Sequence, residues 1–471
     1  MLTELVPRCL ANLVLLTVAI AGAGIPMAKA QSRQAESKDM ESIGRQDLQG
    51  RPAYQPVIHR QGDRWIAYVG LHVGAELNPL TGAKEGNGTM VVDVTDPRKP
   101  VGLAHIPGDR LNPAKESEAQ MVRVCDIAGG SYLLRDAAGR TRVELWNVTN
   151  PAHPSYVSTV VDGLKDTHKN WWECDTGVAY LPVWDPKWRN RMTKIYNLSV
   201  PAHPVFIRDF GLVGQEPGST AETIPPVIHG PISYNGRVYF AYGSSNHGIL
   251  QITDREKLVK GDKPPTPENL LAPQMGRLDM NPSWGGHTTY PLLGVSIPDY
   301  RFDIQGKVRD FMVVTSEETA VACQGPQQIV FFVDITDPAK PFSVSNFQVL
   351  ESSGHFCARG GRFGPHSIQE SFNPIYYKKL IFVSYFNAVV RAVDIRDPFR
   401  PTEVAFYIPP VTEKTKPVCG KINGQENCKI AIQTNNVEVD DRGWIYIVDR
   451  AGTGMDILQL TGDARGIAAL P

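Results

Sequence analysis

The chain has 471 residues, with 48 lysines and arginines against 49 aspartates and glutamates, so its formal net charge is −1. It lacks the positive excess typical of proteins that bind nucleic acid or membrane surfaces, and we expect neither nucleic-acid binding nor membrane insertion. The length alone suggests two or three domains, and the 42 glycines and 37 prolines favour a turn-rich β fold.

Residues 1–30 have the pattern of a cleavable secretory signal. An apolar run over residues 10–23 follows a basic residue and is short for a membrane-spanning helix. The small-x-small sequence Ala28-Lys29-Ala30 then predicts cleavage after Ala30. We therefore expect a periplasmic or secreted protein.

The polar segment over residues 31–50 is mixed in charge and predicts a flexible leader. Residues 51–471 are expected to form a single domain, because one phrase recurs along them. A strand followed by a proline-containing turn returns about every 50 to 60 residues over most of this region. The copies are VVDVTDPRKP (91–100), LWNVTNPAHP (145–154), IYNLSVPAHP (195–204), VDITDPAKP (333–341) and VDIRDPFRP (393–401).

The acidic or amide residue before the turn proline has a structural explanation. A short Asp or Asn side chain in this position accepts a hydrogen bond from its own backbone and sets the turn. We therefore interpret these residues as turn formers rather than as calcium ligands or catalytic groups. They are Asp96, Asn150, Asp337 and Asp397.

Each repeat is interpreted as four short strands, which is typical of a β-propeller blade. We predict an all-β, seven-bladed propeller, with six or eight blades as alternatives. The seventh blade ends without a clear fourth strand, so we expect residues 51–57 to supply it and to close the ring by pairing the N- and C-terminal segments. The blades are predicted to begin near Val57, Glu118, His168, His229, His287, His366 and Asn435.

The recurring phrase resembles the LVIVD repeat of exported bacterial and archaeal proteins. The resemblance covers most of residues 55–460, although the third copy has Val200 where the other copies have Asp or Asn. It implies the propeller architecture but no particular reaction, because that family has no single shared activity.

Six cysteines remain after the expected cleavage, an even number without a Cys-x-x-Cys pair. In an exported protein this pattern favours disulfides over metal thiolates, although the sequence leaves the connectivity open. The tight loop around Asn423-Gly424 favours one pair most strongly, and the third pair follows by elimination, helped by equivalent positions in adjacent repeats. In this order we expect Cys419–Cys428, Cys323–Cys357 and Cys125–Cys174.

Connections on one face of the predicted propeller are much longer than those on the other face. They join the second strand of a blade to its third, or the fourth strand to the next blade. Long connections are uncommon unless they are functional, and repeat proteins collect insertions on their binding face, so we expect this to be the working face. Random drift of insertions is the alternative. The long connections are residues 71–88, 211–227, 258–286, 316–327, 351–365 and 409–430.

Four successive blades have a histidine where the first strand, which lines the central channel, begins. Propeller symmetry points the four imidazoles at the common axis, and neutral imidazole is a suitable ligand for Fe, Cu or Zn. We therefore predict a bound transition-metal ion, with a metal-free pocket or a purely structural role as alternatives. The predicted ligands are His168, His229, His287 and His366.

Three other residues at this mouth are candidate catalytic residues. Glu118 occupies the corresponding place in blade two. Glu317 ends the second strand of blade five, where a carboxylate can orient a histidine ligand. Arg450 ends the second strand of blade seven and is suited to hold an anionic substrate. His72 and His247 face the same mouth and are further candidates for the cluster.

The arrangement is similar to that of two groups of metal-binding propellers, the carotenoid cleavage oxygenases and the selenium-binding proteins of the methanethiol oxidase type. The chain has no diagnostic stretch of either group, so no residue role is transferred. We predict an exported metal-dependent enzyme, an oxidoreductase or oxygenase that acts on a small molecule or glycan. The alternatives are a non-catalytic cell-envelope scaffold that binds through the long-loop face, and a metal-free lyase or hydrolase.

Overall fold

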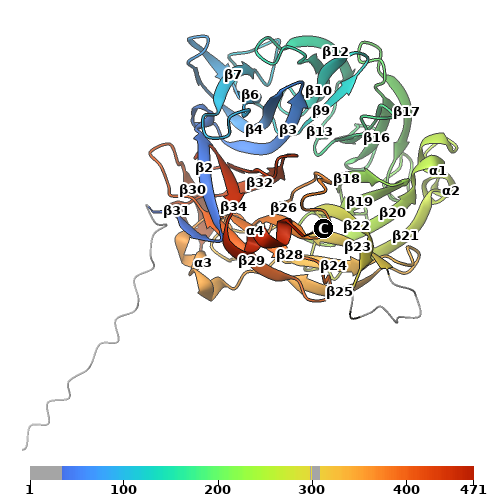
Figure 1. Ribbon diagram of the computed structural model, residues 1–471. Coiled ribbons are helices and arrows are strands. Elements are labelled where there is room, and N and C mark those ends of the chain that lie inside the picture. The colour runs from blue at the N-terminus through green and yellow to red at the C-terminus, as the bar shows by residue number, and fades with distance from the viewer. Residues whose placement is uncertain (1–33, 298, 300–307, 471) are drawn as a thin grey trace, which may run out of the picture.

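The computed structural model describes residues 34–297, 299 and 308–470, which form a seven-bladed β-propeller (Figure 1). Seven antiparallel sheets follow one another around a central axis, so the predicted fold and number of blades are confirmed. The expected signal sequence, residues 1–30, lies outside the described residues. Within them, no helix is both long enough and apolar enough to cross a bilayer.

The first four blades are built from consecutive strands. Blade one contains β3 (Ala53–Gln61), β4 (Arg64–Asn78), β6 (Thr89–Asp93) and β7 (Val101–Ile106), with β5 (Ala83–Gly86) and β8 (Ser117–Ala119) paired to β4. Blade two contains β9 (Val122–Ile127), β10 (Gly130–Ala137), β11 (Arg142–Asn147) and β12 (Ser155–Val161). Blade three contains β13 (Asp166–Thr167), β14 (Trp171–Trp172), β15 (Val178–Trp184), β16 (Met192–Asn197) and β17 (Val205–Phe210). Blade four contains β18 (Ile228–Tyr234), β19 (Arg237–Tyr242), β20 (Ile249–Asp254) and β21 (Gln274–Asp279).

The last three blades include the strands that close the ring. Blade five contains β22 (Thr288–Ser296), β23 (Val308–Thr315), β24 (Val330–Asp334) and β25 (Phe342–Phe347). Blade six contains β26 (Ser367–Ile368), β27 (Leu380–Ser384), β28 (Val390–Asp394) and β29 (Thr402–Ile408), with β1 (Glu36–Lys38) at its edge. Blade seven contains β32 (Thr434–Val439), β33 (Ile445–Asp449), β34 (Met455–Leu460) and β2 (Met40–Gln46). The hairpin of β30 (Pro417–Ile422) and β31 (Gln425–Ile430) and the short helices α3 (Phe356–Arg359) and α4 (Gly462–Ala468) complete the fold.

The N-terminal strand β2 closes the ring by pairing with β34, in the register Met40↔Leu460 (Figure 1). Closure by the two terminal segments is therefore confirmed, but the expected segment, residues 51–57, is wrong. Those residues lead into and begin β3, the innermost strand of blade one. The flexible leader expected over residues 31–50 is also wrong for β1 and β2. An outer strand has one solvated edge and keeps a polar composition, so its sequence resembles that of a leader.

The second strands explain why the repeat can be recognised in the sequence. Each blade is packed between two neighbours, so the second strands are covered on both faces. All residues of β27 are buried, and all of β15 except its last. Continuous runs of β-branched and aromatic residues are typical of such doubly covered strands.

The recurring Asp-Pro and Asn-Pro turns have the predicted local structure. In four copies the side-chain oxygen accepts a hydrogen bond from the backbone N–H two residues later, at 3.0 to 3.2 Å. These side chains are therefore occupied in forming the turn. The residues are Asp96, Asn150, Asp337 and Asp397.

The same turns also join neighbouring blades. The hydroxyl of Ser158 in blade two donates to the carbonyl of Pro201 at 2.6 Å, and Ser345 in blade five donates to Pro398 at 2.5 Å. Across the ring closure, Gly44 of β2 packs directly against the carbonyl of Pro97. The N-terminal strand therefore makes the same contact with blade one that ordinary fourth strands make with the next blade.

Blade four departs from the expected organisation. Residues 258–286 were expected to form one long connection, but they contain the helix α2 (Pro267–Leu271) and β21, the fourth strand. The helix α1 (Arg255–Lys260) begins directly after β20, and the side chain of Asp254 accepts a hydrogen bond from Lys257 N. Asp254 therefore caps a helix instead of forming a proline turn.

Three disulfides link the expected cysteines. Cys419–Cys428 lies within the β30–β31 hairpin, and Cys323–Cys357 joins two of the long loops. Cys125–Cys174 joins β9 of blade two to the turn that follows β14 in blade three. All three predicted pairs are confirmed. Three disulfides in one chain indicate an oxidising compartment.

Candidate functional site at the propeller axis

The four predicted histidines occupy one structural position in blades three to six. His229 lies in β18, His287 and His366 directly precede β22 and β26, and His168 directly follows β13. None is more than 8% exposed. Three of them donate their backbone N–H to the second strand of their own blade, at 2.9 Å in each case. These equivalent bonds fix each residue at the start of its first strand.

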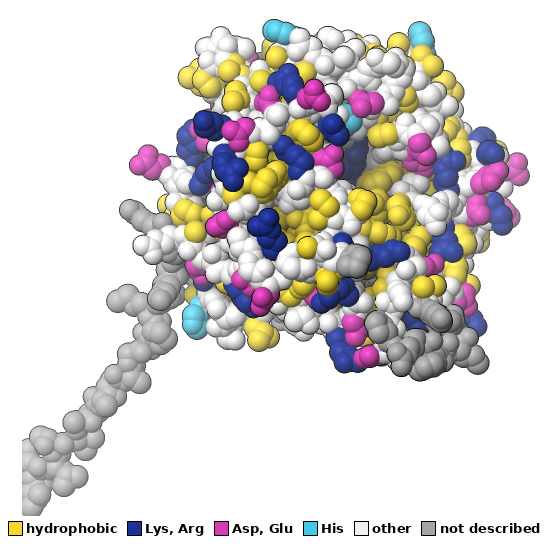
Figure 2. Space-filling view, in the orientation of Figure 1, with side chains coloured by type: hydrophobic (Ala, Val, Ile, Leu, Met, Phe, Trp, Pro, Cys, Tyr) yellow, Lys and Arg dark blue, Asp and Glu magenta, His cyan; other side chains and the backbone are white. Residues whose placement is uncertain are grey.

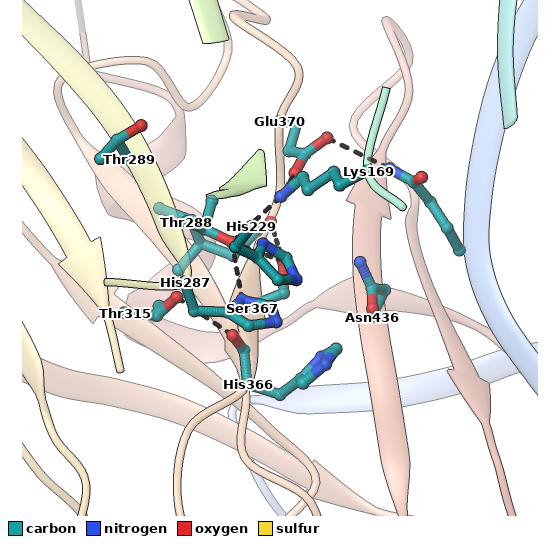
Figure 3. Close-up of polar contacts among 12 residues, drawn as sticks. Lys169, His229, His287, Thr288, Thr289, Thr315, His366, Ser367, Glu370 and Asn436 are labelled. Carbon is teal, nitrogen blue, oxygen red and sulfur yellow. Dashed lines mark hydrogen bonds and ion pairs between the residues drawn. The ribbon is translucent and has the colours of Figure 1, made fainter. Parts of the chain in front are cut away.

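The imidazole rings converge on the axis, as the sequence predicts (Figure 3). Ring centroids are 4.5 Å apart for His168 and His229, 3.5 Å for His229 and His287, and 4.4 Å for His287 and His366. The Nε2 atoms of His168 and His229 lie 2.9 Å apart, within hydrogen-bond distance. Each ring therefore contacts the ring from the next blade.

Tyr54 of blade one completes the ring and was missed by the sequence analysis. Its hydroxyl oxygen lies 3.5 Å from Nε2 of both His168 and His366, so it links the two ends of the histidine series. Tyr54 precedes Val57, the predicted start of blade one, and was therefore not considered as a member of the ring. A register shift between Ala53 and Pro56 separates Tyr54 from the regular part of β3.

Gln120 and Asn435 occupy the remaining two positions, in blades two and seven. Both are at most 5% exposed, and both are hydrogen-bonded to His72 at 3.3 Å. The predicted candidate Glu118 lies beside this ring, where its carboxylate accepts a hydrogen bond from Gln120 Nε2 at 2.6 Å. Glu118 is thus close to the site, and the side chain at the blade-two position is Gln120.

A hydrogen bond determines which ring nitrogen of His366 carries the proton. Nδ1 of His366 lies 2.6 Å from the backbone carbonyl oxygen of Asn435. Because a carbonyl only accepts, Nδ1 carries the proton and the Nε2 lone pair is free. Nδ1 of His287 lies 3.1 Å from Thr288 Oγ1, so it too has a polar partner on the side away from Nε2.

Glu317 brings a carboxylate to these two histidines. Its oxygens lie 3.8 Å from His287 Nε2 and 3.9 Å from His366 Nε2. Arg362 Nη1 donates to the same carboxylate at 3.0 Å. One ligand atom from each of His287, Glu317 and His366 lies within 4.8 Å of the other two. Ligands at about 2.0–2.2 Å from a tetrahedral ion are roughly 3.3–3.5 Å apart, so small side-chain movements bring the three groups to bonding distance.

The histidines are neutral at ordinary pH. Burial lowers the pKa of all four well below the usual histidine value. Neighbouring positive charges lower it further, chiefly Arg191 for His168 and Arg450 for His366. Neutral imidazole is the form that binds a metal ion. Burial also raises the pKa of Tyr54, so its phenol remains protonated without a bound cation.

The hydrogen bonding of the ring nitrogens also distinguishes His287 and His366 from the other two histidines. Among the described residues, His287 Nε2 has no hydrogen-bond partner, and neither do Nδ1 of His168 and Nδ1 of His229. A metal-binding histidine almost always hydrogen-bonds through its other nitrogen. His287 and His366 satisfy that condition, whereas His168 and His229 do not. The structure therefore separates the four predicted ligands into two pairs.

A buried charged cluster lies next to the histidines (Figure 3). Lys169 and Arg123 both form ion pairs with the carboxylate of Glu370. Lys169 Nζ also donates to Thr288 Oγ1 at 3.0 Å. Burial favours the neutral form of Glu370, but Arg123 and Lys169 outweigh it and lower its pKa. A continuous chain of polar contacts thus runs from Glu370 through Lys169 and Thr288 to His287.

Four arginines surround the histidines on the long-loop side. Arg140 and Arg191 both pair with Asp166, at 2.5 and 2.7 Å, and Arg362 pairs with Glu317. The fourth, Arg450, was predicted at this place. Arg140, Arg191 and Arg450 lie in connections between second and third strands. Because the sequence analysis found Arg450 at this position, the same position in the other blades could have revealed Arg140 and Arg191.

Aromatic side chains close the channel at the other end. The ring of Phe372 stacks on Tyr234 and on Tyr290, with centroids 3.9 and 4.9 Å away. This is the face of short turns, on which α4 lies, and hydrophobic side chains gather around its centre (Figure 2). A surface cavity of about 760 Å³, lined by Tyr377 and Leu470 among others, opens on this face and not at the histidines. This cavity is therefore separate from the histidine site.

The fold and the site define a β-propeller with a buried ring of histidines and one tyrosine at its axis. No family model and no curated protein matches the chain. The chain is similar in structure to Sqt1 from Chaetomium thermophilum, with 9% sequence identity, a TM-score of 0.51, and coverage of 89% of this chain and 99% of that one. At this identity the similarity shows the propeller fold alone.

Proposed function

We propose that this protein is a metal-dependent oxidoreductase in which His287, His366 and Glu317 bind a divalent transition metal. The observation that carries the proposal is that these three side chains bring their ligand atoms together within 4.8 Å. Two histidines and one carboxylate are the ligand set of non-haem iron(II) oxygenases, so iron is favoured over copper and zinc. A metal in such a site supplies open positions for oxygen and substrate.

The remaining ring members lie beside this triad. Tyr54 contacts both His168 and His366, and His229 packs against His287. His168 and His229 share a hydrogen bond between their Nε2 atoms, so one of the two holds a proton between the rings. A neutral histidine pair of this kind can accept or donate a proton beside a reacting group.

Export and family membership are part of the proposal. The three disulfides support an oxidising, extracytoplasmic location. The repeated turn and its contact with the neighbouring blade support membership of the LVIVD-repeat family. N-terminal sequencing of the protein recovered from a periplasmic or culture-supernatant fraction tests the export. A first residue at Gln31 supports it, and a full-length cytoplasmic product contradicts it.

Elemental analysis tests the metal centre. The purified full chain is stripped with a chelator, reconstituted with Fe(II), Cu(II) or Zn(II) and desalted. We expect about one equivalent of metal in the wild type and in His153→Ala, a control in an exposed turn. His287→Ala, His366→Ala and Glu317→Ala should retain much less. A wild type without stoichiometric metal, or four variants with equal metal content, would contradict the proposal.

A metal-free lyase or hydrolase is the second candidate. It is favoured by the direct Nε2–Nε2 hydrogen bond of His168 and His229, which needs no ion between the rings. In this case His168 or His229 acts as general base and Arg450 holds an anionic group. The same elemental analysis separates the two candidates, because this function predicts no retained metal in any variant.

A further inference from the structure

The side chain of Arg450 has no partner, although it lies in a crowded, positively charged site. Arg450 follows β33 in blade seven, and its guanidinium makes no hydrogen bond or ion pair within the described part of the chain. Its guanidinium carbon lies 6.0 Å from the ring centroid of Phe386. Burial and the nearby charge of Arg362 together lower its pKa to about 10. The side chain keeps part of its surface exposed, so an anion from solution can reach the guanidinium.

The other three arginines are already paired. Arg140 and Arg191 share one carboxylate, and Arg362 binds another. Within the described residues, Arg450 is the one guanidinium of the four without a carboxylate ion-pair partner.

The free arginine lies beside the histidine ring. The ring centroid of Phe386 lies 6.0 Å from the Arg450 guanidinium carbon and 5.2 Å from the ring centroid of His366, so Phe386 connects the two. Arg450 also has the largest charge effect on the pKa of His366 and acts on that of Tyr54. An oxyanion held by Arg450 would therefore sit over the ring, close to Tyr54 and His366. Guanidinium binds carboxylate and phosphate oxygens in pairs, which also orients the bound group.

We propose that the long-loop mouth is an oxyanion-binding site, in which Arg450 holds a carboxylate or phosphate group of the substrate above the histidine ring. As a statement about substrate it rests on the proposed function, but the binding of the anion does not require a metal. The substrate class is thereby narrowed from any small molecule or glycan to one with an acidic group.

Calorimetric titration of the chelator-treated, metal-free protein with inorganic phosphate and, separately, with oxalate tests this proposal. We expect at least one of the two anions to bind the wild type, and Arg450→Gln to weaken that binding at least ten-fold. Arg450→Lys should keep part of the affinity, because it retains the charge and loses the paired donors. Arg98→Gln, an exposed arginine in a short turn, is the matched control and should bind as the wild type does.

The two anions also identify the chemistry. Binding of oxalate alone assigns a carboxylate, and binding of phosphate alone assigns a phosphate group. Failure of the wild type to bind either anion, or equal affinities of Arg450→Gln and wild type with the folded state verified by circular dichroism, would overturn the proposal. Arg450→Gln also provides the separation from the metal proposal, because it should lose the anion and still retain about one equivalent of metal.

Discussion

His366 donates its Nδ1 proton to the backbone carbonyl of Asn435, 2.6 Å away in the neighbouring blade. A backbone acceptor is present whatever side chain the neighbour carries, so the orientation of this imidazole is fixed by the packing of blade six on blade seven. The free Nε2 then faces Glu317 and the axis.

Glu317→Gln should weaken metal binding without unfolding the protein. The substitution keeps the shape of the side chain and removes the one carboxylate, among residues 34–297, 299 and 308–470, that approaches both His287 and His366. Since ligand charge is lost, we expect affinity to fall by at least about ten-fold, measured by competition with a chromogenic chelator. Glu318→Gln is the matched control, because that carboxylate accepts a hydrogen bond from Ala320 N instead. Equal loss in both variants would show that the effect is structural.

The buried histidines should make the protein less stable in mild acid. Their folded-state pKa values lie well below the usual 6.5, so the unfolded chain takes up protons first as the pH falls below 6.5. Stability therefore declines with falling pH, by at most about 1.4 kcal/mol per histidine at pH 5.5. We expect His229→Asn to show a smaller decrease than the wild type between pH 7.5 and 5.5 in urea unfolding. A larger decrease in the variant would contradict this assignment.

Glu370→Gln should be strongly destabilising. It leaves Lys169 and Arg123 buried without their shared carboxylate, and breaking a buried ion pair costs about 3–5 kcal/mol. Lys169→Met alone keeps the pair of Glu370 with Arg123 and should cost less. The double variant Lys169→Met/Glu370→Gln should recover part of the loss, which a double-mutant cycle of urea unfolding measures. Strict additivity of the two substitutions would argue against direct coupling.

Removing the Cys323–Cys357 disulfide should affect both stability and the site. It joins the loop that carries Glu317 to the loop that carries Arg362, and these two residues are paired. The double substitution to serine should cost about 3 kcal/mol and also lower metal affinity. Cys419→Ser/Cys428→Ser is the control, because that disulfide lies within the β30–β31 hairpin. Metal affinity should be unchanged there.

Gly44→Val should weaken the closure of the ring. A Cβ at this position would overlap the carbonyl oxygen of Pro97 in blade one, so β2 would have to move away from its neighbour. We expect a loss of about 1–3 kcal/mol and faster proteolysis near the N-terminus. Gly102→Val is the control, because Gly102 lies in the fourth strand β7, has no positive φ, and its added Cβ would meet only Gln46 Nε2 at 3.9 Å. Equal stability of the two variants would show that the closing contact is unimportant.

The chain alone determines the repeat and much of the site. The proline turns, the apolar second strands and the histidines at four strand openings are local patterns, because each blade obeys the same packing rules. The sequence therefore predicts seven blades, the disulfides and the convergence of His168, His229, His287 and His366.

Tertiary structure decided the rest, since it depends on which distant segments meet. The polar strand β2 becomes the fourth strand of blade seven only when the ring closes, and its composition does not reveal this. Tyr54 enters the ring of imidazoles through an irregular start of β3. Glu317 lies beside only two of the four histidines, because it follows the second strand of blade five and so reaches the histidines of blades five and six. The repeated blade structure brings the four histidines together, and the differences between blades determine which of the histidines lie near a carboxylate.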